Sequence, residues 1–412
     1  MSTPARAGGE GDAILGILPG VVYEPATAQE AAEVVGESAR DGRTLAFIGG
    51  GTDLERGFPP ESLDAVVRTG RLARVLEYAP SDQIVIVEAG VTLASLQATL
   101  ATHGQRLALD PPLPGRATAG GIVAGNAFGP RRARFGSVRD LIIGISFVRA
   151  DGTLARGGSK VVKNVAGFDL PKLMVGSLGT LGLITSATFR LHPLPEEDLT
   201  VHLPGRTAGG VRAVVAGIRL AQIEPASVVA IWRNDGRFDI GVRFEGFRAG
   251  VAEQRQRLEA LCRGEAGGAC EIDDEASARA FWTGHDALRT ESSLRGRLAL
   301  LPARIETLAA EILPELLRSL DDPGFAWYAT LGLGFFSGSP RDAASASAAI
   351  LTARDRVAES GGTLTLDAAP GEIRERVDVW GPAPAALPLM RSVKERLDPH
   401  RRFAPGRFVG GI

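Results

Sequence analysis

Cysteine is scarce in this sequence, and its scarcity excludes several kinds of site. Cys262 and Cys270 are the only two cysteines among 412 residues. Two thiols cannot supply a disulfide framework, a four-thiolate zinc site or a cysteine-ligated iron–sulfur cluster within this chain. Two free thiols in a reducing compartment are the favoured interpretation, and a Cys262–Cys270 bridge is the alternative.

Long apolar runs are also missing. The longest stretches, such as Leu141 to Val148, fall far short of the ~20 residues that a transmembrane helix needs. Residues 1–12 have no apolar core behind their positive charge, so we interpret them as a disordered tail and not as a signal peptide. We therefore expect a cytoplasmic protein without a transmembrane segment, which partners could bring to a membrane surface.

Neither sign of charge dominates. The 46 Lys and Arg residues against 48 Asp and Glu residues leave a net charge of −2. A nucleic-acid-binding protein needs a broad basic field to neutralise phosphates, so we expect no nucleic-acid partner. The sequence also contains no Walker A loop, no G-x-S-x-G motif and no H-E-x-x-H motif.

What the sequence has in excess is glycine, with 52 residues gathered in short clusters. The first cluster, residues 47–54, directly follows a short apolar strand expected at residues 44–48. Its three successive glycines, Gly49, Gly50 and Gly51, allow positive φ angles and let backbone N–H groups approach a ligand. Such a nest of N–H donors binds anionic oxygens, and Thr52 adds a hydroxyl group. The alternative is an ordinary glycine-rich loop.

Two further clusters follow. Residues 117–125 carry almost no side-chain volume, which predicts either a flat or extended ligand lying on this backbone or close packing of two backbones. Farther along, Gly176, Gly179 and Gly182 are spaced by three. This spacing differs from the G-x-G-x-x-G of a Rossmann fold, and a strand follows it where a Rossmann fold has a helix.

Strands and helices alternate from residue 13 to a proline-rich stop at residues 192–195. Beyond this first boundary we expect long helices over residues 250–261 and 303–320 and a strand over residues 325–333. The last segment is expected to form a helix that ends at Leu397.

The order of four motifs carries a resemblance. GGGTDL, PPLPGRATAGGIVAGN, KNVAGFDLPKLMVGSLGTLGLIT and the C-terminal LDPHRRFAPGRF resemble the FAD-linked oxidases of the vanillyl-alcohol-oxidase type, and within them the family of glycolate oxidase E subunits. This resemblance implies an α+β fold. It would comprise a PCMH-type FAD-binding domain of two α+β subdomains (residues 13–195), an α+β cap domain (196–385) and a C-terminal segment (386–412) that returns to the FAD domain.

The same resemblance implies where FAD would bind. Residues 49–53 would hold the pyrophosphate, residues 118–126 would line the ribityl and pyrophosphate stretch, and residues 182–184 would pack on the adenine end. A cation at Lys163 would stabilise reduced flavin, and a solvated side chain is the alternative there. The expected cofactor-binding residues are Ile48, Gly49, Gly50, Gly51, Thr52, Asp53, Leu54, Pro114, Gly115, Thr118, Ala119, Gly120, Gly121, Ala124, Gly125, Asn126, Lys163, Asn164, Gly179, Gly182, Leu183, Ile184 and Arg407.

Two departures from the family pattern modify these expectations. Relatives with covalent flavin often carry histidine in the first glycine loop, whereas this chain has Thr52 and Asp53, so we expect noncovalent FAD. The C-terminal motif of relatives commonly reads Asn-Pro-Gly-Arg, whereas this chain has Ala404. The missing amide argues against a direct role for residue 404 at the flavin.

Catalytic residues cannot be assigned from the sequence. Oxidation of a 2-hydroxy acid needs a base, a cation for the carboxylate and the flavin as hydride acceptor. Related dehydrogenases use a histidine-rich metal site in the C-terminal half, but this chain has only the widely separated His202, His285 and His400 there. We therefore expect no metal site, and Arg289 and Arg407 are the candidate cations.

The resemblance implies a subunit of a glycolate-oxidising complex. Its partners would be a D-type flavin subunit and an F-type iron–sulfur subunit, which together convert glycolate to glyoxylate, and this chain would serve electron transfer or assembly. One alternative is a self-sufficient FAD-dependent oxidoreductase acting on another hydroxy acid or alcohol. A second is a scaffold whose glycine loops have lost FAD.

Overall fold

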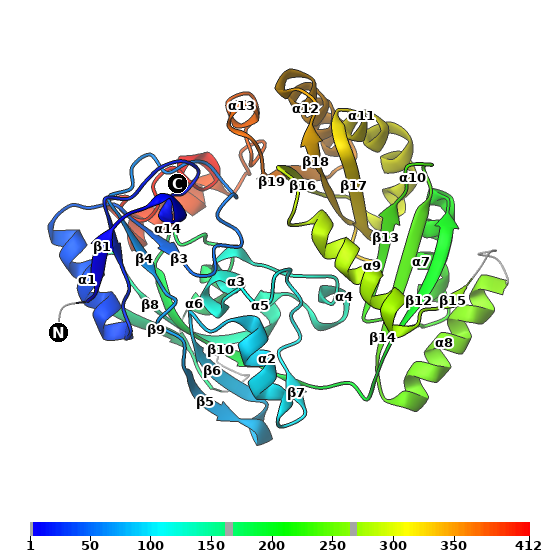
Figure 1. The fold of residues 1–412 in the computed structure, drawn as a ribbon, viewed down its shortest axis with the longest axis horizontal. Helices are drawn as coiled ribbons and strands as arrows, with labels where there is room; N and C mark the ends of the chain where they lie inside the picture. The colour runs from blue at the N-terminus through cyan, green and yellow to red at the C-terminus, as the bar shows by residue number, and fades with distance from the viewer. Residues whose placement is uncertain (1–2, 161–167, 264–269) are drawn as a thin grey trace. The chain divides into compact units, whose positions relative to one another are not determined.

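The computed structural model describes residues 3–160, 168–263 and 270–412, and the chain divides into two compact units (Figure 1). Unit 1 comprises Met1–Gly129, Gly136–Leu194 and Ala383–Ile412. Unit 2 comprises Pro130–Phe135 and Pro195–Pro382. Each unit combines helices with sheets, so the predicted α+β class is confirmed. No described helix is both long and apolar enough to cross a bilayer.

The first sheet of unit 1 presents the first glycine cluster. Its strand order is β1 (Ala5–Ala7), β2 (Val21–Tyr23), β4 (Ala65–Arg68), β3 (Leu45–Ile48), and β4 runs parallel to both β2 and β3. Helix α1 (Ala28–Arg40) begins after Thr27, whose hydroxyl accepts the Glu30 N–H as an N-cap. Its apolar side packs with strand residues in one core cluster. This core fixes the end of β3, where the glycines begin.

The expected disordered tail is wrong for most of its length. Strand β1 pairs antiparallel with β2, and the carboxylate of Asp12 is buried. That carboxylate lies 2.6 Å from the guanidinium of Arg6, 2.7 Å from that of Arg68, and accepts the Gly9 N–H. Two cations and a backbone donor compensate the buried charge, and they attach the N-terminus to the sheet.

The second sheet of unit 1 is antiparallel throughout. Its order is β5 (Val75–Ala79), β6 (Ile84–Glu88), β10 (Leu183–Arg190), β8 (Ile142–Val148), β9 (Leu154–Gly158). A small pair, β7 (Gln105–Arg106) with β11 (His192–Pro193), lies outside it. The helices of this part are α2 (Leu93–Ala101), α3 (Ala119–Gly125), α5 (Val138–Leu141) and α6 (Leu170–Met174), and α14 (Leu387–Leu397) follows near the C-terminus.

Unit 2 is built on one antiparallel sheet of eight strands. The order is β15 (Glu271–Ile272), β12 (Glu197–Arg206), β14 (Phe238–Gly246), β13 (Ser227–Trp232), β17 (Leu320–Tyr328), β18 (Leu333–Pro340), β16 (Leu294–Ala299), β19 (Thr363–Ala368). Its longer helices are α7 (Ala208–Leu220), α8 (Arg248–Arg263), α9 (Glu275–Leu288) and α12 (Ala343–Glu359). The short helix α4 (Arg132–Phe135) belongs to this unit because Arg131 forms an ion pair with the buried Glu245 at 2.6 Å.

Two element predictions in unit 2 are wrong. The expected helix over residues 303–320 is a series of short turns, η3 (Pro302–Arg304), α10 (Ile305–Thr307), the π-turn η4 (Leu308–Ile312) and α11 (Leu313–Arg318). Pro314 lacks the N–H that an uninterrupted helix requires, so a new helix begins there. The expected strand over residues 325–333 spans the end of β17 and the start of β18, which turn at Gly332 with φ +70°.

The Asp12 contacts generate a prediction about acid stability. The guanidinium of Arg6, followed by Arg68, holds the pKa of the Asp12 carboxyl well below its usual range. A lowered carboxyl pKa stabilises the fold above the unfolded-state value of ~3.9 and loses this effect as the pH falls. We expect Asp12→Asn to cost about 1–3 kcal/mol of unfolding free energy at pH 7 and less below pH ~4.

Urea unfolding at pH 7 and at pH 3 measures this difference. Asp41→Asn is the matched control, because Asp41 forms an exposed pair with Arg43 and should change stability by less than about 1 kcal/mol. Equal effects of the two substitutions at pH 7 would contradict the assignment.

Candidate functional site

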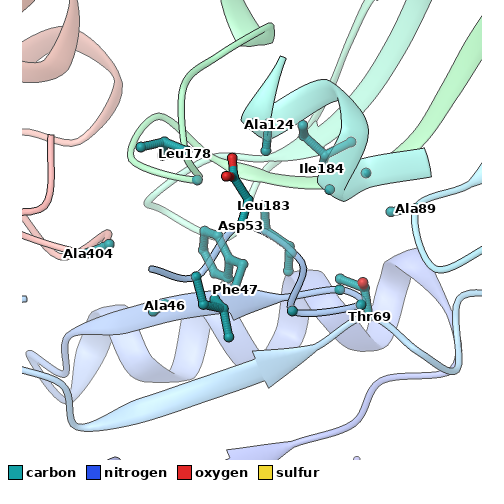
Figure 2. Close-up of a pocket in the computed structure, with 18 of the residues that line it drawn as sticks. Ala46, Phe47, Asp53, Thr69, Ala89, Ala124, Leu178, Leu183, Ile184 and Ala404 are labelled. Carbon is teal, nitrogen blue, oxygen red and sulfur yellow. The ribbon is translucent and has the colours of Figure 1, made fainter. Parts of the chain in front are cut away.

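A groove in unit 1 brings the three glycine clusters together. It holds about 790 Å³ of space, open solvent included, between the end of β3, the following loop, helix α3 and residues 178–184. Figure 2 shows the Asp53 side chain pointing into this space towards Ala124 and Leu178. The lining residues are Ile14, Ala46, Phe47, Gly49, Gly50, Gly51, Thr52, Asp53, Leu54, Thr69, Ala89, Gly120, Gly121, Ala124, Gly125, Leu178, Gly179, Gly182, Leu183, Ile184, Ala404 and Arg407.

The loop after β3 presents backbone donors to the groove. Strand pairing ends at Ile48, and Gly51 takes a left-handed conformation with φ +69°. Among the described residues, the structure records no hydrogen-bond partner for the backbone N–H groups of Gly50, Gly51 and Thr52. Unpartnered N–H groups on consecutive residues form a site for anionic oxygens.

Several glycines are required by close packing between chain segments. A β-carbon at Gly49 would overlap the Thr118 hydroxyl, and one at Gly50 would overlap the carbonyl oxygen of Arg116. A β-carbon at Gly125 would lie 2.6 Å from Asp53 Oδ2. These positions exclude larger side chains because the first loop and the second cluster contact each other directly.

Most of the second cluster forms helix α3. Thr118 caps α3 by accepting the Gly121 N–H at 3.3 Å. Gly120 and Gly121 both line the groove, but they differ in how closely they are packed. Gly120 serves close packing, since a β-carbon there would lie 2.7 Å from the Ala89 side chain. Gly121 is exposed and lines the groove, with only the Thr118 hydroxyl near its β-carbon position.

Arg56 connects the loop after β3 to the end of helix α3. The Arg56 guanidinium lies 2.9 Å from the Asp53 carboxylate and donates a hydrogen bond of 2.7 Å to the carbonyl oxygen of Gly125. A carboxylate repels phosphate oxygens. We therefore interpret Asp53 as the residue that joins the glycine loop to α3, rather than as a direct phosphate ligand.

The C-terminal motif supplies the next part of the wall. The Ala404 N–H donates to the carbonyl oxygen of Leu45, and the Phe403 ring packs edge-on against Phe47 at 5.0 Å. Arg407 is buried and donates to the carbonyl oxygens of Leu54 and Arg56 at 3.1 and 2.8 Å. The motif thereby places Ala404 and a guanidinium at the groove.

A buried lysine connects this motif to the third cluster. The Lys394 ammonium lies 2.7 Å from the Asp398 carboxylate and donates to the carbonyl oxygens of Thr180 and Phe403. Both charged side chains are buried, and burial lowers the pKa of Lys394 below its usual range. Asp398 also accepts the Phe403 N–H, so one ion pair holds both segments.

Most, but not all, of the expected cofactor-binding residues line the groove. Ile48 lies in the core beneath it, while Pro114 and Gly115 are exposed and outside it. Lys163 and Asn164 lie outside the described residues. Thr118, Ala119 and Asn126 are also not among the lining residues.

The sequence analysis missed other lining residues, namely Ile14, Ala46, Phe47, Thr69, Ala89, Leu178 and Ala404. Phe47 and Leu178 are close in sequence to the clustered glycines, and this proximity could have identified them as lining residues. Ile14, Thr69 and Ala89 are distant from every motif, and only the sheet arrangement brings them to the groove. Ala404 contributes to the wall through its position and its backbone.

Comparison with known proteins agrees with this geometry. The family model described as an FAD binding domain matches residues 19–158. Among solved structures, p-cresol methylhydroxylase with substrate bound superposes with a TM-score of 0.76 over 97% of this chain and 90% of that chain, at 15% identity. Residues 19–158 therefore match an FAD binding domain, and the chain shares the fold of p-cresol methylhydroxylase. The resemblance found in its motifs and the PCMH-type fold are thus confirmed.

Curated relatives match about half of the chain or less. Glycolate oxidase subunit GlcE of Escherichia coli (strain K12) is 32% identical over 227 residues, which are 55% of this chain and 63% of that subunit. D-lactate dehydrogenase of Archaeoglobus fulgidus is 36% identical over 183 residues, 44% of this chain and 40% of that enzyme. In both matches the chain spans less than two thirds of the relative's own length.

The residues present fit FAD. The free N–H groups after β3 suit a pyrophosphate, and the narrow groove is floored by glycine and alanine. Two buried polar atoms beside it, Asn126 Oδ1 and Ser177 Oγ, have no hydrogen-bond partner within the described part of the chain. Buried polar atoms of this kind are unusual unless a bound group satisfies them.

A glycine pair tests the groove. Gly121→Asp should abolish stoichiometric FAD binding, because the carboxylate would enter the groove beside the phosphate site. The third residue of a helix tolerates Asp well, so the fold should persist. Flavin content after purification measures the effect. Gly115→Asp is the control, since a side chain there meets no atom within 4 Å; equal flavin content in both variants would contradict the placement.

Gly50→Val is not a suitable test of cofactor binding. Its side chain would collide with the Arg116 carbonyl, so loss of flavin would accompany loss of fold.

A lysine pair tests the C-terminal connection. Lys394→Met should cost about 3–5 kcal/mol of unfolding free energy, because it leaves the Asp398 carboxylate buried without its cation. Lys160→Met removes an exposed pair with Glu77 and should cost less than about 1 kcal/mol. Chemical denaturation of both variants measures the difference, and similar losses would refute the role of Lys394.

Proposed function

We propose that this chain is the FAD-binding subunit of a glycolate oxidase complex and holds its FAD noncovalently. The observation that carries the proposal is the convergence of three glycine segments on one groove with free backbone donors. The likeness to the E. coli subunit supports glycolate as the substrate of the complex. Noncovalent binding is supported by the lining residues, since none of those described is His, Cys or Tyr.

No described histidine lines the groove of unit 1. His285 belongs to unit 2 and is buried between the Tyr328 hydroxyl and the Asp286 carboxylate, at 2.9 and 3.0 Å. Burial lowers its pKa, so the ring is neutral at pH 7. Within the ranges that the structure covers, no group of three or more His, Cys, Asp and Glu side chains could hold a metal ion.

The candidate carboxylate cations also have structural partners. The Arg289 guanidinium donates to the Tyr328 hydroxyl at 3.1 Å and stacks on the Phe335 ring at 4.5 Å. Arg407 donates to two backbone carbonyl groups of the glycine loop and is buried. This distribution supports placing the base and the substrate carboxylate site on another subunit.

The proposed roles of the three subunits follow from these sites. Oxidation of glycolate to glyoxylate removes a hydride from carbon and a proton from the hydroxyl group, and FAD supplies the acceptor of the hydride equivalent. In this chain, the amides of Gly50, Gly51 and Thr52 would bind the pyrophosphate, and Arg407 would add positive charge to the wall. A D-type flavin subunit would supply the catalytic residues, and an F-type iron–sulfur subunit would carry the electrons away.

Flavin release and bleaching test the proposal. We expect the purified chain to be yellow, and acid precipitation should leave all flavin in the supernatant. Glycolate should not bleach the chain alone but should bleach the mixture with the D-type and F-type subunits. The spectrum near 450 nm is the readout.

Two other results would point elsewhere. Rapid bleaching of the chain alone by glycolate, lactate or another alcohol would establish the self-sufficient oxidoreductase instead. A colourless protein that gains no FAD on incubation would establish the scaffold.

A further inference from the structure

A second groove lies in unit 2, separate from the groove that fits FAD. Its lining residues come mainly from helix α7 and the residues that follow it, from α4 and from the start of η3, and it holds about 1420 Å³ including open space. Its floor is apolar, with Ile218 and Ile223 almost fully buried and Pro225 and Pro302 beside them. None of its lining residues belongs to unit 1.

One face of α7 forms the wall of this groove. Arg212, Val215, Ala216 and Arg219 line it, and their spacing of three, four and seven residues puts them on a single stripe of the helix. The stripe therefore has a guanidinium at each end and small apolar side chains between. A helix rises 1.5 Å per residue, so the two arginines are separated by ~10 Å along the axis.

Two exposed leucines are next to lining residues in the sequence. Leu220 follows Arg219 and is 78% exposed, and Leu301 precedes Pro302 and is 68% exposed. Large apolar side chains left in water around a polar-rimmed groove are typical of surfaces that bind another protein.

The rim is predominantly positive. Arg134 donates to the backbone carbonyl oxygens of Glu224 and Glu245, and no ion pair of its guanidinium is recorded within the described ranges. Arg219 has no recorded ion pair with any residue that the structure describes. Arg212 is paired with Glu306 at 2.9 Å across an exposed surface, and Glu224 is the acidic residue of the lining. Such a rim attracts an acidic partner and repels a basic one.

We propose that this α7 groove docks an acidic amphipathic segment of a partner subunit. The segment would carry carboxylates about two helical turns apart, facing Arg212 and Arg219, with apolar residues between them against Val215 and Ala216. A small anion would use the arginines and leave the apolar floor and both leucines in water, so a protein segment fits better. This inference rests on the proposed function, because it assigns the surface through which the complex assembles.

Charge reversal in the full-length, FAD-loaded chain tests the proposal. Binding to the purified D-type and F-type subunits, singly and together, is measured by biolayer interferometry. The double variant Arg212→Glu/Arg219→Glu should weaken binding at least tenfold. Ala216→Glu, which removes no arginine and lies at an exposed helical position, should weaken it similarly. Higher salt should weaken binding of the unaltered chain.

The matched control is Arg279→Glu. Arg279 is also an exposed helical arginine with an ion pair to a glutamate, but it lies on α9 and does not line the groove. We expect its binding to remain within twofold of the unaltered chain. Flavin content should be the same in all variants, because every substitution lies in unit 2.

Each other outcome has a distinct meaning. Tight binding by both groove variants would overturn the docking site and leave the proposed function intact. Equal weakening by Arg279→Glu would show a general charge effect and would also overturn it. Failure of the unaltered chain to bind either subunit would overturn the docking site together with membership of the complex.

Discussion

The contact between the loop after β3 and the start of α3 is the constraint on which the site depends. Gly49 and Gly50 lie so close to Thr118 and Arg116 that a β-carbon would not fit, and the Arg56–Asp53 pair fastens the loop to Gly125. The loop makes this contact without hydrogen bonds from the N–H groups of Gly50, Gly51 and Thr52, which have no recorded partner among the described residues. These N–H groups are therefore available to a ligand. The lack of side chains on the loop glycines thus allows both the close contact with α3 and the approach of a ligand to the backbone.

The C-terminal segment completes this arrangement through a buried charge. Lys394 and Asp398 are costly to bury, and the structure compensates them with each other and with the backbone of Thr180 and Phe403. The C-terminal segment is therefore held in a defined position beside the glycine loop. Arg407 of the same segment lines the groove and donates hydrogen bonds to the carbonyl oxygens of Leu54 and Arg56.

The polar groups of the two units differ in their hydrogen-bond partners. In unit 1 the free donors converge on a narrow groove lined by small residues, which suits a cofactor. In unit 2 the His285, Tyr328 and Arg289 side chains satisfy one another, whereas the arginines along α7 face an open apolar groove. A protein that binds flavin in one unit and a partner through the other accounts for both patterns.

Local sequence signals were enough to predict many of the elements and the conformational freedom of the glycine-rich backbone. The Thr27 N-cap, the short apolar strand before the first glycine cluster, and the glycine runs are local signals, and local hydrogen bonding and steric freedom decide their structure. Motif order was enough to indicate the resemblance to FAD-linked oxidases. Contacts between distant segments decide which glycines are closely packed: Gly120 and Gly121 both line the groove, but Gly120 packs on Ala89 whereas Gly121 is exposed. That choice, like the ordering of residues 3–12 and the place of Ala404, depends on contacts between segments far apart in the chain, which local sequence patterns do not encode.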